Sequence, residues 1–200
     1  VGDATQIVRA AEAIDRAQRP VLLAGGGVIS GNATGELREL AHKANLPVAM
    51  TLMGLGSYEQ TLPESLDMLG MHGTAYANYA VQECDLLIAV GVRFDDRVTG
   101  DVRSFAPKAR VIHIDIDPSS INKNIRVDVP IIGDVANVLG DLLTVFKAEA
   151  KAPKIDPWWF EIGRWRSRNS LAYKKNDDII MPQYAIQRLF ELTRDKNTYI

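Results

Sequence analysis

The sequence predicts an α/β fold, a doubly wound, Rossmann-like parallel sheet flanked by helices. Short apolar segments alternate along the chain with segments in which apolar residues recur at helical spacing. The alternation repeats at intervals of about 20 to 30 residues, which is typical of a parallel sheet built from βα units. Several apolar segments also run directly into glycine, which permits a tight turn after a strand.

In the first part of the chain, a helix is predicted over residues 4–18, because its apolar residues recur at helical spacing and Arg19-Pro20 ends the pattern. The segment 21–24 is apolar throughout and is predicted to be a strand. A second helix is predicted over 34–44 from the same spacing. The apolar segment 46–50 is the next predicted strand.

The second part repeats this alternation. A helix is predicted over 75–84, and it leads into the apolar strand 85–90. The segment 110–117 alternates as a strand and ends in Asp-Pro, which suits a helix N-cap and first turn. A last strand over 129–132 precedes a helix over 135–148.

Composition narrows the function classes. The chain has 200 residues, a formal net charge of −2 and three histidines, so charge gives no reason to expect nucleic acid or an anionic membrane as a partner. No apolar run approaches the ~20 residues that cross a bilayer, and no signal segment opens the chain. The single cysteine, Cys84, excludes an internal disulfide and a cysteine-based metal site, and we expect it to be a buried structural thiol.

The ends and the composition predict the domain organisation. The first residue is not methionine and residues 197–200 resemble the start of a strand, so we expect a piece of a longer polypeptide. Residues 1–150 are predicted to form one domain. After them, the segment 151–181 is expected to be a linker, with 151–154 followed by an aromatic and basic helix. Acidic residues flank its tryptophans, so an amphipathic helix packed on a neighbouring domain is favoured over a nucleic-acid site.

Candidate ligand-binding residues follow the predicted strands. In a doubly wound sheet the ligand lies across the carboxyl ends of the strands. Glycine there lets a backbone approach a phosphate, and carboxylates can accept hydrogen bonds from ribose hydroxyls. Together these residues suit an adenine dinucleotide. They are Gly25 to Gly27, Thr51-Leu52, Gly91 to Asp95, Asp115 to Asp117 and Gly133-Asp134.

Each of these elements also has a structural explanation. The three glycines lack the G-x-G-x-x-G spacing and could form a simple turn. Asp117 and Asp134 could be helix N-caps, and His72 could be a loop histidine with its hydrogen bonds satisfied. The charges of Arg93 to Arg97 are too close together for one solvated helix face; they either point into a site or form a structural ion-pair cluster.

Several catalytic schemes are absent from the sequence. It contains no G-x-S-x-G, no H-E-x-x-H and no G-x-x-x-x-G-K motif, and no Gly-Asp-Gly of the kind that begins a thiamine diphosphate magnesium site. The residues therefore predict a ligand cradle without a catalytic base and without a metal site.

Four long motifs in order resemble one enzyme family. They are Thr51 to Gly56, Leu69 to Thr74 with Tyr76-Ala-Asn-Tyr79, the decapeptide Gly91 to Gly100, and His113 to Asp117. Over residues 1–150, and more loosely to 200, the chain is similar to the central domain of acetolactate synthase. The resemblance implies three α/β domains, of which the middle one binds FAD and the outer two bind thiamine diphosphate and Mg²⁺. It also implies that residues 182–200 are the start of the third domain.

The resemblance also implies the roles of individual residues. Lining of the substrate channel is implied for Arg97, Asp96, Met71 and His72, with Arg97 helping to bind the carboxylate of the second oxoacid. FAD contacts are implied for Gly26, Thr51, Leu52, Leu69, Gly70, Met71, His72, Gly91, Val92, Arg93, Phe94, Asp95, Asp115, Ile116, Asp134 and Val135. No catalytic residue is implied within the chain, so the chain alone is expected to be inactive.

The implied reaction condenses pyruvate with pyruvate or 2-oxobutyrate, with loss of CO₂, in branched-chain amino acid biosynthesis. The resemblance further implies a bacterial cytoplasmic homo-oligomer, a dimer or tetramer, that can associate with a regulatory subunit. Two alternatives stay open. One is another thiamine diphosphate enzyme, a glyoxylate carboligase or a pyruvate oxidase; the other is a non-catalytic nucleotide-binding domain.

Overall fold

The computed structural model describes residues 2–146, 154–176 and 178–198. The chain divides into two compact units, Val1–Arg168 and Asn169–Ile200, which are described separately. No helix in the described part of the chain combines the length and the apolar character that crossing a membrane requires.

Unit 1 is built on a six-stranded sheet in which every neighbouring pair is parallel, with the order β3-β2-β1-β4-β5-β6. This is the strand order of a doubly wound dinucleotide-binding sheet, so the predicted fold class is confirmed. The order reverses between β1 and β4, where the crevice of such a sheet opens. The strands are β1 (Pro20–Ala24), β2 (Val48–Met50), β3 (Ser65–Met68), β4 (Leu86–Val90), β5 (Arg110–Asp115) and β6 (Val129–Ile132).

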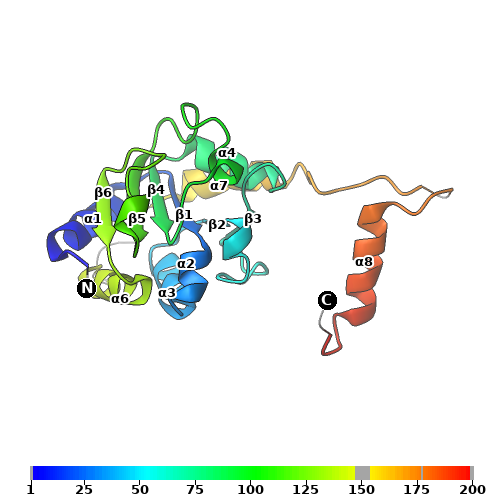
Figure 1. Cartoon of the computed structure of the whole chain (residues 1–200). Coiled ribbons are helices and arrows are strands. Elements are labelled where there is room, and N and C mark those ends of the chain that lie inside the picture. The colour runs from blue at the N-terminus through cyan, green and yellow to red at the C-terminus, as the bar shows by residue number, and fades with distance from the viewer. Residues whose placement is uncertain (1, 147–153, 177, 199–200) are drawn as a thin grey trace. The chain divides into compact units, whose positions relative to one another are not determined.

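Helices cover both faces of the sheet (Figure 1). Alternate residues of β1 separate the two cores: Leu22 packs with α1, α3 and α6, whereas Leu23 packs with α4 and α7. Because both faces are buried, the central strands are apolar throughout, as the sequence suggested. The helices are α1 (Ala4–Arg16), α2 (Gly26–Ser30), α3 (Thr34–Lys43), α4 (Ala75–Glu83), α5 (Asp96–Thr99), α6 (Val135–Val145) and α7 (Asp156–Arg166), with 3₁₀ turns η1 (Leu52–Gly54) and η2 (Pro118–Ser120).

Short polar side chains fix where several helices begin. Asp3 accepts hydrogen bonds from the amides of Thr5 and Gln6 at the start of α1. Thr74 accepts one from Ala77 N at the start of α4, at 3.2 Å. These caps satisfy amides that have no partner inside the helix.

Two of the elements that were not predicted, β3 and α2, lie next to the loops described below. No strand was predicted where the short edge strand β3 lies, because its four residues mix polar and apolar types. Arg166 of α7 donates to the carbonyls of Pro63 and Ser65 and so ties this strand to the unit. The helix α2 begins directly at Gly26, where glycine had suggested a turn.

Some predicted boundaries change. The strand predicted to reach residue 117 ends at Asp115, because Asp117 caps η2 instead. The end of the helix predicted to 148, most of the linker 151–154 and the last two residues of the strand predicted over 197–200 lie outside the described residues.

The aromatic helix α7 belongs to unit 1. The sequence predicted a helix packed on a neighbouring domain, and its packing partner is the part of unit 1 within residues 2–146. Trp158 is 2 % exposed, and its Nε1–H donates to Pro20 O at 3.1 Å. Trp159 Nε1–H donates to Asn45 O at the same distance. Trp158 and Trp159 therefore serve packing, and the indole N–H of each has an acceptor.

The structural role predicted for Cys84 is confirmed. The thiol is fully buried, and its S–H donates to Val81 O at 3.1 Å. Desolvation by burial raises the pKa of the Cys84 thiol above its usual range, which suppresses the reactive thiolate.

Unit 2 contains the helix α8 (Pro182–Thr193). None of the residues of α8 is buried, and its large apolar side chains Ile186 and Phe190 are exposed.

We expect Trp158→Phe to lower the free energy of unfolding by about 1 to 3 kcal/mol, because the ring still packs but Pro20 O loses its donor. Urea unfolding of the whole chain, followed by circular dichroism, measures the change. Phe160→Leu is the matched control on the same helix, since Phe160 is 72 % exposed, and it should change stability by less than ~0.5 kcal/mol. Equal effects of the two substitutions would contradict the anchoring role of Trp158.

Candidate ligand-binding edge of the sheet

The loops after β1 and β4 touch through their backbones. Gly25 N–H donates to Val90 O at 2.9 Å, and Gly27 N–H donates to Gly91 O at 3.1 Å. A Cβ built on Gly25 would lie 2.1 Å from Gly91 O, and one built on Gly27 would lie 2.6 Å from Gly91 Cα. Any side chain at these positions would force the loops apart. We call Gly25, Gly27 and Gly91 the glycine contact.

Gly91 is restricted in a second way. Its φ is +60°, in the left-handed region that L side chains rarely adopt. The glycine contact therefore fixes the path of the chain as it leaves β4, at the point where the strand order reverses.

The loop after β2 packs against the same place. Thr51 N–H donates to Ala24 O at 2.9 Å, and Thr51 Oγ1 accepts from Gly54 N at 3.1 Å, which caps η1. A Cβ on Gly26 would lie 3.2 Å from the Cβ of Met53. Leu52 and Met53 are 69 % and 70 % exposed, so they offer apolar surface beside the glycine contact.

The loop after β3 carries Leu69 to His72. Leu69 is buried, whereas Met71 and His72 are exposed. Gly70 has φ +98°, and a Cβ on it would lie 2.5 Å from Arg97 O. The structure thus brings this loop against α5, so that two groups of predicted channel residues lie on neighbouring segments.

The loop after β4 alternates buried and exposed side chains. Val92 and Phe94 are 2 % exposed, so only their backbones are available to a ligand. Phe94 has φ +51°, which is uncommon for a bulky residue. This alternation leaves Arg93 and Asp95 on the outside of the loop.

Two residues that the sequence did not single out as site residues hold this loop. His113 is fully buried on β5, its Nε2–H donates to Val92 O at 2.7 Å, and its ring packs edge-on against Phe94. Asn124 Nδ2–H donates to Phe94 O at 2.7 Å. A signal for His113 was present: a histidine on a strand buried on both faces needs a polar partner.

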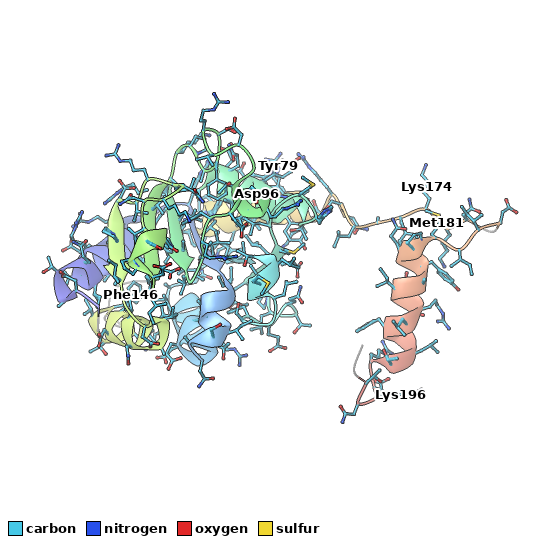
Figure 2. All side chains as sticks on the ribbon, in the orientation of Figure 1. Tyr79, Asp96, Phe146, Lys174, Met181 and Lys196 are labelled. Atoms are coloured by element: carbon cyan, nitrogen blue, oxygen red, sulfur yellow. The ribbon has the colours of Figure 1, made fainter. Side chains whose placement is uncertain are left out.

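The charges after β4 form two weak, local pairs. Arg93 lies 3.7 Å from Asp95, and Arg97 lies 4.0 Å from Asp96. The four side chains are between 45 % and 86 % exposed, and pairs of this kind contribute little to stability. A structural ion-pair cluster therefore does not account for them. Figure 2 shows Asp96 at the surface of unit 1.

The carboxylates after β5 and β6 differ in environment. Asp115 is 7 % exposed, its Oδ1 accepts from Asp117 N at 2.9 Å, and His113 Nε2 lies 3.8 Å from its Oδ2. The neighbouring Ile116 is exposed. Asp134 Oδ1 accepts from Asn137 N at 3.0 Å, and Val135 is buried, so Asp134 is an N-cap as one interpretation held.

Asp117 is also an N-cap. It accepts from Ser119 N and Ser119 Oγ, at 2.9 Å and 2.8 Å, and these bonds lower the pKa of its carboxyl below the ordinary value.

The comparisons with known proteins agree with this architecture. The family described as "Thiamine pyrophosphate enzyme, central domain" matches residues 7–142.

The chain belongs to the thiamine pyrophosphate enzyme family.

Its sequence is 42 to 48 % identical to those of three relatives over nearly the whole chain. It is 48 % identical over 205 residues to the probable acetolactate synthase large subunit of Methanocaldococcus jannaschii, covering 100 % of the chain and 34 % of the relative. It is 44 % identical over 193 residues to the acetolactate synthase large subunit of Buchnera aphidicola subsp. Schizaphis graminum, and 42 % identical over 196 residues to the acetolactate synthase isozyme 3 large subunit of Escherichia coli K12. These two matches each cover 96 % of the chain and 34 % of the relative. The chain thus spans about a third of the length of these relatives.

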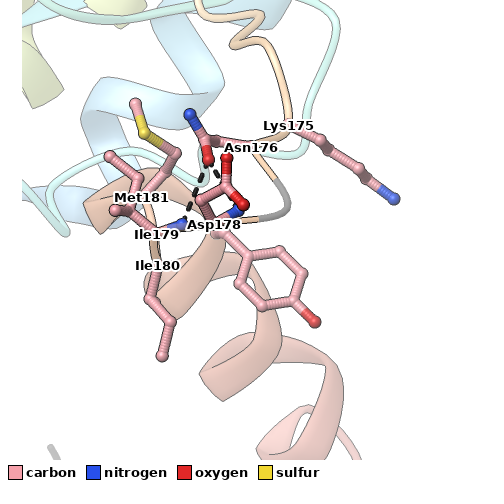
Figure 3. A pocket seen from close by; sticks show the side chains of 7 residues that line it. Lys175, Asn176, Asp178, Ile179, Ile180 and Met181 are labelled. Atoms are coloured by element: carbon pink, nitrogen blue, oxygen red, sulfur yellow. Dashed lines mark hydrogen bonds between the residues drawn. The ribbon is translucent and has the colours of Figure 1, made fainter.

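The fold brings most of the predicted ligand-binding positions to one edge of the sheet. A pocket of about 410 Å³ lies elsewhere, in unit 2, and is lined by side chains of the 175–184 segment (Figure 3). Asn176 Oδ1 accepts there from the amides of Asp178 and Ile179. None of the predicted site residues lines this pocket.

The arrangement at the sheet edge suits binding rather than acid–base chemistry. The glycine contact leaves backbone without side chains at the switch point, where a dinucleotide lies in such folds. Asp95 Oδ1 is buried without a hydrogen-bond partner among the described residues, so one acceptor at this edge is unsatisfied. Within the described ranges, no three His, Cys, Asp or Glu side chains are placed to hold a metal ion.

We expect Gly91→Ala to destabilise the chain by about 2 kcal/mol or more, because alanine is strained at φ +60° and its Cβ would meet Gly27. Urea unfolding measures the change. Gly140→Ala, in the middle of α6 with no atom within 4 Å of the added Cβ, should instead stabilise by about 0.5 to 1 kcal/mol. An unchanged midpoint in Gly91→Ala would show that the two loops separate at little cost.

Proposed function

We propose that the chain is the FAD-binding central part of an acetolactate synthase large subunit. The observation that carries the proposal is its identity of 42 to 48 % with acetolactate synthase large subunits over 96 to 100 % of the chain. The full-length protein would condense two 2-oxoacids, pyruvate with pyruvate or with 2-oxobutyrate, with loss of CO₂. This reaction involves no net electron transfer, so a bound flavin would serve mainly as a structural element.

The residues at the sheet edge fit an extended flavin dinucleotide. The glycine contact, with Gly26 beside it, would accommodate the phosphates, since no side chain blocks the backbone. The loop after β4 would contribute the backbones of Val92 and Phe94 and the side chains of Arg93 and Asp95. On the side of β5 and β6, Asp115, Ile116, Asp134 and Val135 would hold the adenosine end, and on the other side Thr51, Leu52 and Leu69 to His72 would follow the flavin.

The exposed side chains between the loops after β3 and β4 would line a substrate channel. Arg97 is the residue best suited to a 2-oxoacid carboxylate, because a guanidinium is always charged and donates two hydrogen bonds in one plane. Its only ion pair among the described residues is the 4.0 Å contact with Asp96, and its side chain is 77 % exposed. It is therefore available to a substrate. Met71 and His72 would form the adjoining wall.

The remaining parts of the proposal concern the full-length protein. Thiamine diphosphate and Mg²⁺ would be bound by regions that correspond to the other two thirds of the relatives, and the chain alone would not catalyse the reaction. The full-length protein would be a cytoplasmic dimer or tetramer that can associate with a regulatory subunit. Residues 1–150 would form the central domain, 151–181 the linker and 182–200 the start of the next domain.

We expect Asp115→Ala to raise the Kd for FAD about 10-fold or more in the full-length protein, because a hydrogen bond to a charged group is lost. Asp115→Asn keeps an acceptor for Asp117 N and should give a smaller increase. Quenching of flavin fluorescence measures the Kd. Asp141→Ala, on the exposed side of α6, is the control. Wild-type FAD affinity in both Asp115 variants would contradict the assigned contact.

We expect Arg97→Ala to lower kcat/KM for acetolactate formation about 10- to 100-fold while the flavin content stays unchanged, because the carboxylate loses a charged donor. Arg103→Ala, whose side chain is 91 % exposed and pairs with Asp101, should retain wild-type rates. Product analysis with pyruvate, with and without 2-oxobutyrate, accompanies the rates. Undiminished acetolactate formation by Arg97→Ala would exclude the proposed role, and a different product would indicate another enzyme of the family.

A further inference from the structure

Asn78 on α4 makes two hydrogen bonds to one residue of the loop after β3. Its Oδ1 accepts from Gly70 N at 2.9 Å, and its Nδ2–H donates to Gly70 O at 2.9 Å. A side-chain amide that pairs with both polar groups of one residue fixes the position and the orientation of that residue. Asn78 is half-buried, so solvent competes only partly for these groups.

Gly70 depends on this contact. Its carbonyl also accepts from Gly73 N at 3.0 Å, but Asn78 is the partner of its N–H among the described contacts. The φ of +98° places Gly70 in a region that only glycine adopts readily. The two hydrogen bonds to Asn78 therefore hold the Gly70 backbone in one of the several conformations that are open to glycine.

Gly70 in turn supports α5. A Cβ on Gly70 would lie 2.5 Å from Arg97 O, so the backbone of Arg97 packs directly against Gly70. The exposed Met71 and His72 directly follow Gly70 in the chain. A shift of Gly70 would therefore move both walls of the proposed substrate channel together.

We propose that Asn78 is the positioning residue of the substrate channel. By holding Gly70, it determines the positions of Arg97 and Met71. The proposal rests on the proposed function, because the channel is defined there. Asn78 itself contacts neither substrate nor cofactor in this role. It acts on the acceptor oxoacid through the geometry of Arg97.

The first test uses the 200-residue chain and requires no ligand. Hydrogen exchange of the Gly70 amide, followed by NMR, should become about 10-fold faster in Asn78→Ala, because the acceptor of this N–H is lost. Asn78→Leu, which has a similar size but offers Gly70 neither an acceptor nor a donor, is the second variant should Asn78→Ala not fold. Gln82→Ala is the matched control: it lies one turn along α4, and its Nε2–H donates to Ser104 O at 2.8 Å. Unchanged Gly70 exchange in the Asn78 variants overturns the proposal.

The second test uses the full-length protein with its cofactors. Asn78→Ala, measured at saturating FAD, should change the ratio of 2-oxobutyrate to pyruvate used as acceptor about threefold or more, because a displaced Arg97 shifts the bound acceptor and so changes the space left for the longer chain of 2-oxobutyrate. A purely structural role would lower stability without moving this ratio, and Gln82→Ala should leave it at the wild-type value. If Arg97→Ala changes the ratio and Asn78→Ala does not, the positioning role fails while the proposed function stands. If the wild-type protein forms no acetolactate, the proposed function fails. The channel role of Asn78 then fails too, even if the Asn78 variants change the hydrogen exchange of Gly70.

Discussion

The close approach of two backbones at the switch point is the constraint on which the site depends. Gly25, Gly27 and Gly91 let the loops after β1 and β4 touch where any Cβ would separate them. The order of the strands places these loops next to each other, and the absence of side chains lets them meet. The edge is therefore lined by backbone groups, which suits a phosphate-bearing ligand better than a surface covered with side chains would.

Around this contact, half-buried and buried polar side chains hold the loops in place. His113 and Asn124 bind the carbonyls of Val92 and Phe94, and Asn78 binds both polar groups of Gly70. The loops thus have fixed backbones, while their charged side chains remain exposed. This division keeps the backbone of the candidate site rigid and its charged groups accessible.

Local sequence patterns predicted much of the fold, because parallel strands buried on both faces must be apolar throughout. The strands β1 and β4 and the helix α1 lie close to their predicted limits. Which residues lie at the candidate ligand-binding edge was also predictable, since any residue that follows a strand of a parallel sheet comes to the same edge. The four-residue strand β3 was missed, because its mixed residues have no periodicity of their own and its place depends on β2 and Arg166.

The sequence by itself determined the fold class, the alternation of strands and helices and the glycines that follow the strands, because these depend on near neighbours in the chain. Only the tertiary structure decided the strand order, the contact of Gly25 with Gly91 and the contact of Gly70 with Arg97. It also decided that His113 and Asn78 support the loops of the site. The physical reason is that each of these contacts joins segments far apart in the chain, and local periodicity carries no information on which distant segments meet.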